Sequence, residues 1–396
     1  MYRLTNAVKY YDWGSTTAIP GFLGTEPDGR PVAEVWMGAH PSGPSWAAGR
    51  SLLEMIESEP AEMLGERVVG EHGPRLPFLF KILAASRPLS LQVHPNRAQA
   101  IEGFARENAA EVPLAMRERS FHDDQHKPEM LLALTRFEGL CGFRSPRRVL
   151  ELLEPLGGPL AETIRTALLA DPSARGTQAA FEGVLEARGS VAPSDIEETV
   201  KGCEAQLVTG FGDHRAYGTV VALAHWYPGD PGAVASLMLN RFTLEPGESA
   251  FVGAGVVHAY LAGLGLETMA SSDNVLRAGL THKKIDVAAL LECTVYDDSP
   301  VVRPVPVPGR GGQPATIRAE AREFALALAA PARAGGPQYV TQDGPRVAVC
   351  TRGSLGLRAA DGSELALTKG ESVFVPHSAG RLEVRGDGEA VVVFVP

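Results

Sequence analysis

Turn-forming residues recur so often along this chain that they argue against a helical bundle. The 396 residues include 43 glycines and 30 prolines, which separate short runs of apolar and β-branched residues. Such punctuation is typical of many short strands joined by turns. The regions that show it most clearly are 31–50, 78–94, 129–140, 241–258 and 264–269. The sequence therefore predicts a mainly β fold.

One segment, residues 145–225, differs from the rest because its apolar residues recur at helical spacing. Ser145 followed by Pro146 is typical of a helix start, since serine caps the first turn and proline fits the first helical position. We therefore expect a helical insertion here. A short additional helix is expected from Asp230 to about Asn240, because aspartate followed by proline again favours a helix start.

The end of the chain repeats a pattern found earlier. The stretch LALTKGESVFVPHSAGRLEV has the same turn-then-strand arrangement as LEPGESAFVGAGVVHAYL, and a proline-rich linker, residues 301–314, lies between them. We therefore expect three parts. A β domain comprises residues 1–144 and 226–300, the helical insertion comprises 145–225, and a second β domain comprises 301–396.

Charge and composition limit the kinds of partner. With 37 basic against 47 acidic residues the formal net charge is −10, which argues against nucleic acid or an anionic membrane, because both require a basic surface. No run approaches the about 18 apolar residues of a membrane helix, and no secretory signal is recognisable, so we expect a cytoplasmic protein. Its four isolated cysteines are expected to be reduced and buried.

The stretch LSLQVHP, residues 89–95, places polar groups at every second position. Ser90, Gln92 and His94 alternate with aliphatic residues, and alternate residues of a strand share a face. A hydroxyl, an amide and an imidazole therefore look into one space, which is either water or a site. We expect the aliphatic face to pack against a second sheet.

Two distant residues could complete a site with this strand. Glu129 follows Pro128, which cannot donate to a strand ladder, so Glu129 is expected to open a buried strand. His258 ends a glycine-rich turn. Two imidazoles, one carboxylate and one amide oxygen suit a divalent ion of intermediate softness, zinc first. The candidate ligands are Gln92, His94, Glu129 and His258, although spacing alone leaves open that each is an ordinary core or surface residue.

Six stretches together resemble the type I mannose-6-phosphate isomerases, which are zinc-dependent members of the cupin superfamily. They are YDWGS (11–15), EVWMGAHPSGPS (34–45), FLFKILAASRPLSLQVHP (78–95), HKPEM (126–130), GVVHAYLAG (255–263) and ETMASSDNVLRAGLTHKKIDV (267–287). The match extends over most of the chain. Two positions depart from the family pattern: Gln125 stands where members have asparagine, and His282 where they have proline.

The resemblance implies a fold, a cofactor and a reaction. The fold is mainly β, with cupin-type jelly-roll barrels and an α-helical insertion domain; the C-terminal cupin-like domain lacks a Gln-x-His strand and is expected to bind no metal. One zinc ion per chain is implied, held by Gln92, His94, Glu129 and His258. The implied reaction interconverts mannose 6-phosphate and fructose 6-phosphate, which moves a proton between C2 and C1 through an enediol-type intermediate.

Three further residues are expected to be catalytic. The resemblance marks Arg277, and because arginine stays protonated we expect it to hold an oxyanion or phosphate, or to assist ring opening, rather than to act as a base. Lys127 lies two residues before Glu129 and so shares its strand face. Glu267 is the most attractive spare carboxylate. The general base stays unassigned.

Lys81, Ser90 and Lys283 are expected to bind the substrate. Lys81 ends an apolar run, a costly place for a charge unless it emerges into a cavity. Ser90 lies on the polar face described above, and Lys283 could contact phosphate. Asp273 is expected to serve a turn, and His40 to pack in the core.

Two rival functions remain. An iron-dependent dioxygenase cupin usually gathers its ligands within a few residues, whereas 34 residues lie between His94 and Glu129 here. A non-catalytic sugar-binding cupin would not need Lys127 and Arg277. We expect small sugar phosphates as partners, neither nucleic acid nor membrane, and a monomer, with a dimer left open.

Overall fold

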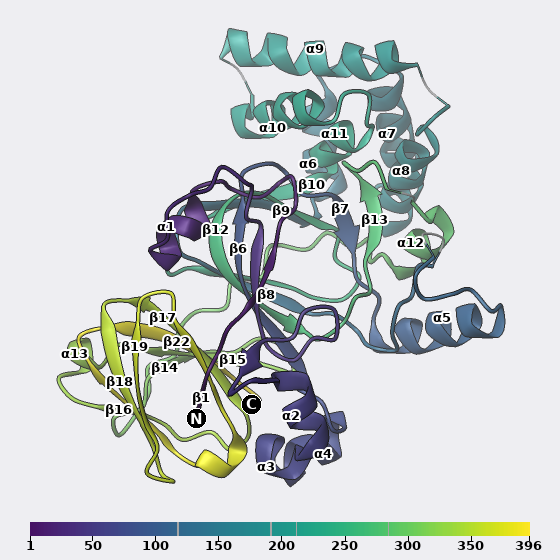
Figure 1. Cartoon of the computed structure of the whole chain (residues 1–396). Helices are drawn as coiled ribbons and strands as arrows, with labels where there is room; N and C mark the ends of the chain where they lie inside the picture. Colours follow the sequence, from purple (N-terminus) through teal and green to yellow (C-terminus); the bar gives the residue numbers. More distant parts are fainter. Residues whose placement is uncertain (117–118, 191, 211, 284) are drawn as a thin grey trace.

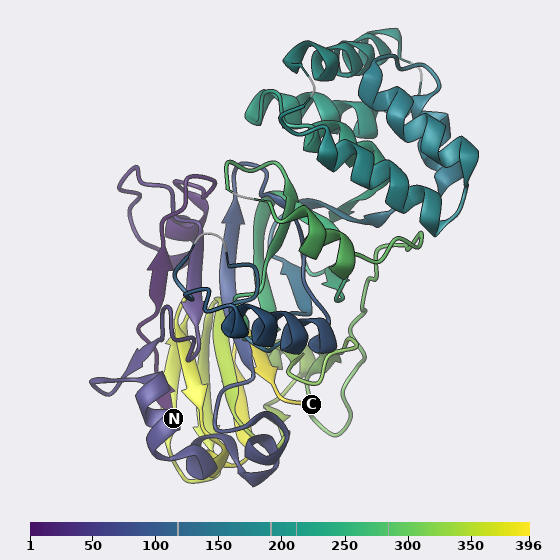
Figure 2. The same ribbon diagram turned by 90° about the vertical axis from the view of Figure 1, so that its right-hand side faces the viewer.

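The computed structural model describes residues 1–116, 119–190, 192–210, 212–283 and 285–396. The C-terminal strands, drawn in yellow, lie at one end of the molecule, a central sheet in the middle and a block of helices at the other end (Figures 1 and 2). The N-terminus lies beside the C-terminal strands. Within the described ranges, no helix is long and apolar enough to cross a membrane.

In the described part of the chain, ten antiparallel strands form the central sheet, whose main order is β10-β9-β12-β6-β3-β2. The strands are β2 (Ala7–Lys9), β3 (Glu34–Met37), β6 (Phe78–Ala85), β7 (Leu91–Val93), β8 (Glu129–Ala133), β9 (Phe137–Phe143), β10 (Leu239–Leu244), β11 (Ser249–Val252), β12 (His258–Ala270) and β13 (Leu276–Gly279). Strand β12 pairs with β6, β7, β8 and β9. All four partners precede the helical segment and β12 follows it, so β12 joins the two halves of the sheet.

A bulge in β12 lets both of its ends face one cavity. The register of β12 against β9 shifts between Tyr260 and Ala262, and Gly263 has a φ of 130°. Successive residues of a strand point to opposite faces, so His258 and Glu267, an odd number of positions apart, would face opposite ways in a regular strand. The extra residue at the bulge brings them to the same side.

The helical insertion forms where the sequence predicts it. Its helices are α6 (Pro146–Leu153), α7 (Pro159–Ala170), α8 (Ala174–Glu186), α9 (Pro193–Thr209) and α10 (His214–Trp226). The Ser145 hydroxyl accepts a hydrogen bond from the backbone N–H of Arg148 at 3.4 Å and so caps α6. The buried faces of these helices share one core cluster with strands β7, β9 and β13.

Two expectations are wrong in this region. Leu91 and Val93 do not pack on a second sheet but belong to the cluster that contains the buried residues of the helices, because β7 lies on the side of the sheet nearest to them (Figure 1). The helix expected over 230–240 is also shorter. It consists of α11 (Gly232–Ala235) and a single 3₁₀ turn, η1 (Ser236–Met238), before β10 begins.

The C-terminal part is a sandwich of two antiparallel sheets. One has the order β1-β20-β17-β22-β15-β14 and the other β16-β21-β18-β19, and their inner faces share one core cluster. Its elements are β14 (Ala315–Ile317), β15 (Ala325–Ala329), α13 (Pro331–Ala334), β16 (Gln338–Val340), β17 (Arg346–Arg352), β18 (Ser354–Ala359), β19 (Glu364–Thr368), β20 (Ser372–Val375), η2 (His377–Ala379), β21 (Leu382–Gly386) and β22 (Glu389–Phe394). The first strand of the chain, β1 (Tyr2–Arg3), pairs with β20.

The remaining helices of the described residues lie outside the helical insertion. They are α1 (Ala18–Leu23), α2 (Leu52–Ser58), α3 (Pro60–Leu64), α4 (Glu66–His72), α5 (Arg97–Ala109) and α12 (Val287–Cys293). All four cysteines are free and buried, as predicted. The expected fold class, cupin-like antiparallel β structure with a helical insertion, is confirmed.

The hairpin of β4 (Trp46–Ala47) and β5 (Arg50–Ser51) contains a poorly matched turn residue. Its two-residue turn has a φ of 48° at Ala48 and 79° at Gly49, the left-handed pair that a type I′ turn requires. Asparagine tolerates this conformation better than alanine, so Ala48→Asn is expected to stabilise the fold by about 0.5 kcal/mol. Urea unfolding checks this, and Ala47→Asn, at a buried strand position, is the control expected to destabilise. An unchanged midpoint for Ala48→Asn contradicts the prediction.

Candidate metal centre

Strand pairing places three candidate residues in one row. His258 of β12 is opposite Gln92 of β7, and Gln92 is opposite Arg277 of β13. Directly opposed residues of antiparallel strands project from the same face. The Gln92 side-chain amide accordingly lies 3.1 Å from His258 Nε2.

Glu129 enters this row from strand β8. Its Oε1 lies 3.2 Å from His94 Nε2, and its Oε2 lies 3.3 Å from His258 Nε2. The three side chains are 0 to 2% exposed, and their ligand atoms all lie within 4.8 Å of one another. A carboxylate and two imidazoles from strands far apart in the sequence therefore converge at one buried point.

The proton positions show that this point suits a cation. His94 Nδ1 lies 2.7 Å from the carbonyl of Asn274, and His258 Nδ1 lies 2.9 Å from that of Val256. A carbonyl can only accept, so both Nδ1 atoms carry the hydrogen and both Nε2 atoms present lone pairs. In the described part of the chain, His94 Nε2 and Glu129 Oε2 are buried without a hydrogen-bond partner. Lone pairs facing one another in this way fit a bound metal ion.

The electrostatics keep these groups in ligand form. Burial lowers the pKa of His94 to about 4, so its imidazole is neutral near pH 7. Burial alone would raise the pKa of Glu129, but the ammonium of Lys127, 3.4 Å away, favours the charged carboxylate, and the pKa of Glu129 lies well below its usual range. Gln92 can add its amide oxygen if the amide is turned toward the ion, since O and N are nearly indistinguishable in shape.

A second polar row crosses the sheet beside this centre. Glu267 of β12 is opposite Lys81 of β6, and Lys81 is opposite Trp36 of β3. The Lys81 Nζ lies 3.0 Å from Glu267 Oε2 and 3.4 Å from Glu34 Oε1. Burial would lower the pKa of Lys81, but these two carboxylates raise it above its usual value. Lys81 is therefore a buried cation held between two acids.

Glu267 differs from Glu129 in the direction of its pKa shift. Burial raises the pKa of Glu267, and the attraction of Lys81 only partly opposes this. A buried carboxyl group with a raised pKa in a cavity is the usual signature of a group that exchanges protons.

Both rows open into one cavity of about 1280 Å³, which also receives the remaining predicted residues. Lys127 and Ser90 line it together with Gln92 and Glu129, and Arg277 and Lys283 line it further along β13 and the following turn. Burial lowers the pKa of Lys283, and the nearby guanidinium of Arg277 lowers it further. In the described ranges neither of these two cations has a carboxylate within ion-pair distance.

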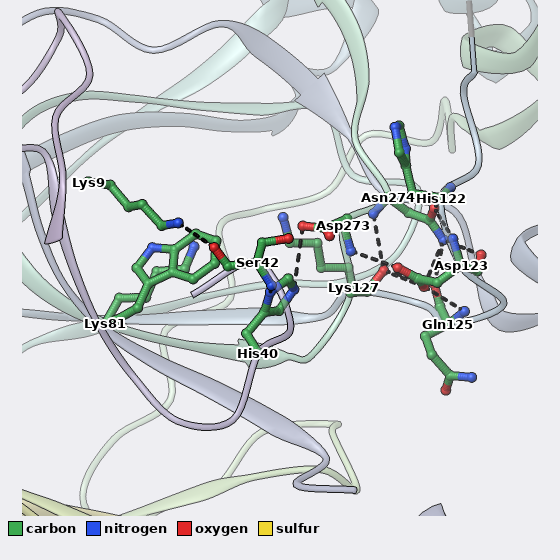
Figure 3. A network of polar contacts seen from close by, with 12 residues as sticks. Lys9, His40, Ser42, Lys81, His122, Asp123, Gln125, Lys127, Asp273 and Asn274 are labelled. Carbon is green, nitrogen blue, oxygen red and sulfur yellow. Dashed lines mark hydrogen bonds and ion pairs between the residues drawn. The ribbon is translucent and has the colours of Figure 1, made fainter. Parts of the chain in front are cut away.

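A network that the sequence did not predict supports His94 from behind. The fully buried Asn274 accepts from the backbone N–H of His122 at 2.7 Å and donates to the carbonyls of Asp123 and Gln125 at 2.8 and 2.9 Å (Figure 3). The carbonyl of Asn274 in turn accepts from His94, so the network fixes the orientation of this ring. The turn chemistry of SSDN was recognisable, but nothing in it points to His94.

Asp273 and His40, expected to be turn and packing residues, also contact one another. The buried His40 places Nε2 3.4 Å from Asp273 Oδ1, while its Nδ1 accepts from the backbone N–H of Ser42 at 3.2 Å (Figure 3). The backbone N–H of Asp273 donates to Asp123 Oδ2 at 2.7 Å. The Asp273 carboxylate is thereby held at the cavity wall from two sides.

Comparisons with known proteins agree with this geometry. A family model described as phosphomannose isomerase type I, catalytic domain, matches residues 1–146. The chain is 36% identical over 400 residues to the mannose-6-phosphate isomerase of Escherichia coli (strain K12), covering 100% of this chain and 99% of that protein. It is 34% identical over 322 residues to the Homo sapiens mannose-6-phosphate isomerase, covering 76% of this chain and 74% of that protein.

Solved structures show the same similarity over the whole length. A crystal structure of mannose 6-phosphate isomerase bound with zinc and yttrium aligns with a TM-score of 0.88 and 35% identity, covering 100% of this chain and 99% of that one. The apo form from Salmonella typhimurium aligns with a TM-score of 0.89 and 35% identity at the same coverage. Since sequence and fold agree from end to end, the chain belongs to the type I mannose-6-phosphate isomerase family.

Proposed function

We propose that this chain is a zinc-dependent aldose–ketose isomerase that interconverts mannose 6-phosphate and fructose 6-phosphate. The observation that carries the proposal is the buried set of His94, Glu129 and His258, whose lone pairs converge beside a cavity lined by Arg277 and Lys283. In the described part of the chain these two cations have no carboxylate within ion-pair distance. An aldose–ketose conversion needs an electrophile at the sugar oxygens and a cationic group that holds the phosphate, and the residues that line this cavity can supply both.

We propose Gln92, His94, Glu129 and His258 as the ligands of one zinc ion. Zinc with a single carboxylate and three neutral ligands keeps a charge of about +1, which supplies Lewis-acid stabilisation of negative charge on the sugar oxygens. A centre with more carboxylates would lose this surplus charge. The hydrogen bonds from both Nδ1 atoms to backbone carbonyls keep each imidazole in the tautomer that can bind a metal.

We propose that Arg277, Lys283 and Ser90 hold the phosphate or an oxyanion of the substrate. The two cations are close enough for Arg277 to lower the pKa of Lys283, and in the described ranges neither has an acidic partner. A doubly charged phosphate between them would relieve their repulsion and form charge-assisted hydrogen bonds. Ser90, which lies just before β7 and lines the same cavity, can donate its hydroxyl to the same anion.

Lys127 and Glu267 are the groups that we propose to exchange protons with the sugar. Both side chains line the cavity, and Glu267 has a raised pKa, so it can accept or release a proton closer to neutral pH than an exposed glutamate. Lys81 holds Glu267 in place through its 3.0 Å ion pair and remains charged. Lys127 can donate to a developing enediolate oxygen.

Removal and return of the metal tests the function. Treatment with a chelator is expected to lower the rate of a coupled mannose 6-phosphate isomerase assay at least about 100-fold, because the electrophile contributes several kcal/mol. Stoichiometric zinc is expected to restore the rate. Iron with oxygen uptake would instead indicate a dioxygenase, and saturable sugar binding without turnover a non-catalytic cupin.

We further propose that the three expected parts of the chain act as separate domains in a monomeric cytoplasmic protein. Residues 1–144 and 226–300 supply every proposed site residue, 145–225 form the helical block, and 301–396 form the sandwich together with β1. The net charge of −10 again disfavours nucleic acid and anionic membranes.

A further inference from the structure

The backbone that follows Arg277 adopts a conformation that its sequence does not favour. Leu280 has a φ of 54°, a left-handed value uncommon for a residue other than glycine, and its side chain is 1% exposed. Such strain persists only where the surroundings fix the backbone, and it gathers at functional sites. The next residues, Thr281 and Lys283, line the substrate cavity.

Asp230 fixes this backbone from behind. Its Oδ1 accepts from the backbone N–H of Gly232 at 2.8 Å, and its Oδ2 accepts from that of Thr281 at 3.3 Å. Gly232 and Gly279 allow the two segments to touch, because a Cβ on Gly232 would lie 3.1 Å from Leu280 N and one on Gly279 would lie 3.1 Å from Gly232 Cα. The strained turn is therefore clasped by the segment that leads out of the helical insertion.

Arg188 holds the same turn from within the insertion, and its contacts with the turn, together with those of Asp230, are called the clasp below. It lies just beyond the end of α8, and its guanidinium donates to Asp230 Oδ2 at 2.8 Å and to the carbonyl of Thr281. The backbone N–H of Thr281 thus donates to Asp230, and the backbone carbonyl of Thr281 accepts from Arg188. The Thr281 hydroxyl then accepts from the backbone N–H of Lys283 at 3.1 Å. A continuous chain of polar contacts therefore runs from the helical insertion to the backbone of Lys283, whose side chain lines the cavity.

We propose that Arg188 and Asp230 are positioning residues for the isomerase reaction, which hold the Leu280–Lys283 turn so that Lys283 meets the substrate phosphate. The inference rests on the proposed role of Lys283. It gives the helical insertion a part in catalysis: the insertion supplies no group to the sugar but sets the geometry of the phosphate site. In the described part of the chain, Arg188 and Asp230 make no hydrogen bond or ion pair with the proposed zinc ligands.

Steady-state kinetics of the zinc-loaded full chain tests the proposal. Arg188→Ala is expected to raise KM for mannose 6-phosphate about tenfold, the size of one lost charge-assisted hydrogen bond, while kcat stays within about twofold. The inhibition constant of inorganic phosphate is expected to rise by the same factor. Arg188→Ala is expected to add nothing in a Lys283→Ala background, because both changes disable the same contact.

Arg165→Ala is the matched control. Arg165 lies on α7 and also pairs with a carboxylate, that of Glu162, and donates to two backbone carbonyls, but it is not part of the cavity lining. Its loss is expected to leave KM unchanged. An equal rise in KM for both variants would mean that the clasp only contributes to the stability of the helical block, and would overturn the proposal.

The outcomes separate this inference from the proposed function. An unchanged KM for Lys283→Ala would refute the proposed phosphate contact of Lys283, and with it the proposed role of the clasp. A raised KM for Lys283→Ala beside an unchanged KM for Arg188→Ala overturns the clasp alone. If Arg188→Ala does not fold, Asp230→Asn replaces it, because its amide keeps the acceptor for Gly232 but puts a donor opposite Thr281 and Arg188. A raised KM then supports the clasp, and an unchanged KM overturns it.

Discussion

Glu129→Ala is expected to empty the metal centre and abolish isomerisation. Glu129 is the single carboxylate among the four proposed ligands, and it faces both imidazoles at 3.2 and 3.3 Å. Residues behind a metal ligand typically change affinity 10- to 100-fold, so removing a charged ligand is expected to weaken zinc binding by more than about 100-fold. The rate is expected to fall by about 10³-fold or more, because the zinc ion is the proposed electrophile and the variant no longer holds it.

Glu138→Ala is the control for this experiment. Glu138 lies on β9 next to β12, but its carboxylate pairs with Arg241 and Arg136 at the outer face rather than in the cavity. It is expected to keep one zinc per chain and near-normal kcat. Zinc is measured by atomic emission after dialysis, with circular dichroism to show that both variants are folded. A Glu129→Ala chain that keeps one tightly bound zinc per chain would refute the ligand assignment.

Local sequence patterns were sufficient where the determinants are local. The serine cap and proline at the start of α6, the alternation of β7 and the position of Glu129 after Pro128 all depend on residues a few positions apart. Where a pattern was ambiguous, tertiary pairing decided. The helix expected over 230–240 stops early because Leu239–Leu244 pairs with β9, and strand pairing there outweighs a weak helical preference.

The remaining features depend on contacts between distant segments. The pairing of β1 with β20 joins the two ends of the chain, and no local signal marks it. Asn274 and His94 are far apart in sequence and meet only because β7 and β13 are neighbours. The bulge in β12 reverses the alternation of side chains along the strand, so that His258 and Glu267 both face the cavity. Its only trace in the sequence is a glycine.

Arg277→Ala is expected to separate metal binding from turnover. Arg277 is opposite Gln92, yet in the described part of the chain its side chain makes no hydrogen bond or ion pair with a proposed ligand, so the variant is expected to keep one zinc per chain. Burial lowers the pKa of Arg277, but an arginine remains cationic near pH 7, and its charge is directed to the cavity rather than to an acidic partner in the described ranges. Loss of one such stabilising donor is expected to lower kcat about 10²- to 10³-fold.

Arg87→Ala is the matched arginine control, and it decides what kind of charge the reaction needs. Arg87 also lines the cavity, but its guanidinium lies over the Trp226 ring, 4.8 Å from the centroid. If any cation at the cavity wall were enough, both variants would lose turnover equally. If the charge must act at the reacting oxygens, only Arg277→Ala loses turnover. Arg277→Lys is then expected to recover little of it, because one ammonium cannot reproduce the planar fork of donors of a guanidinium. Near-normal kcat in a zinc-loaded Arg277→Ala chain would make this arginine a structural residue and leave Lys127 and Glu267 to stabilise the intermediate.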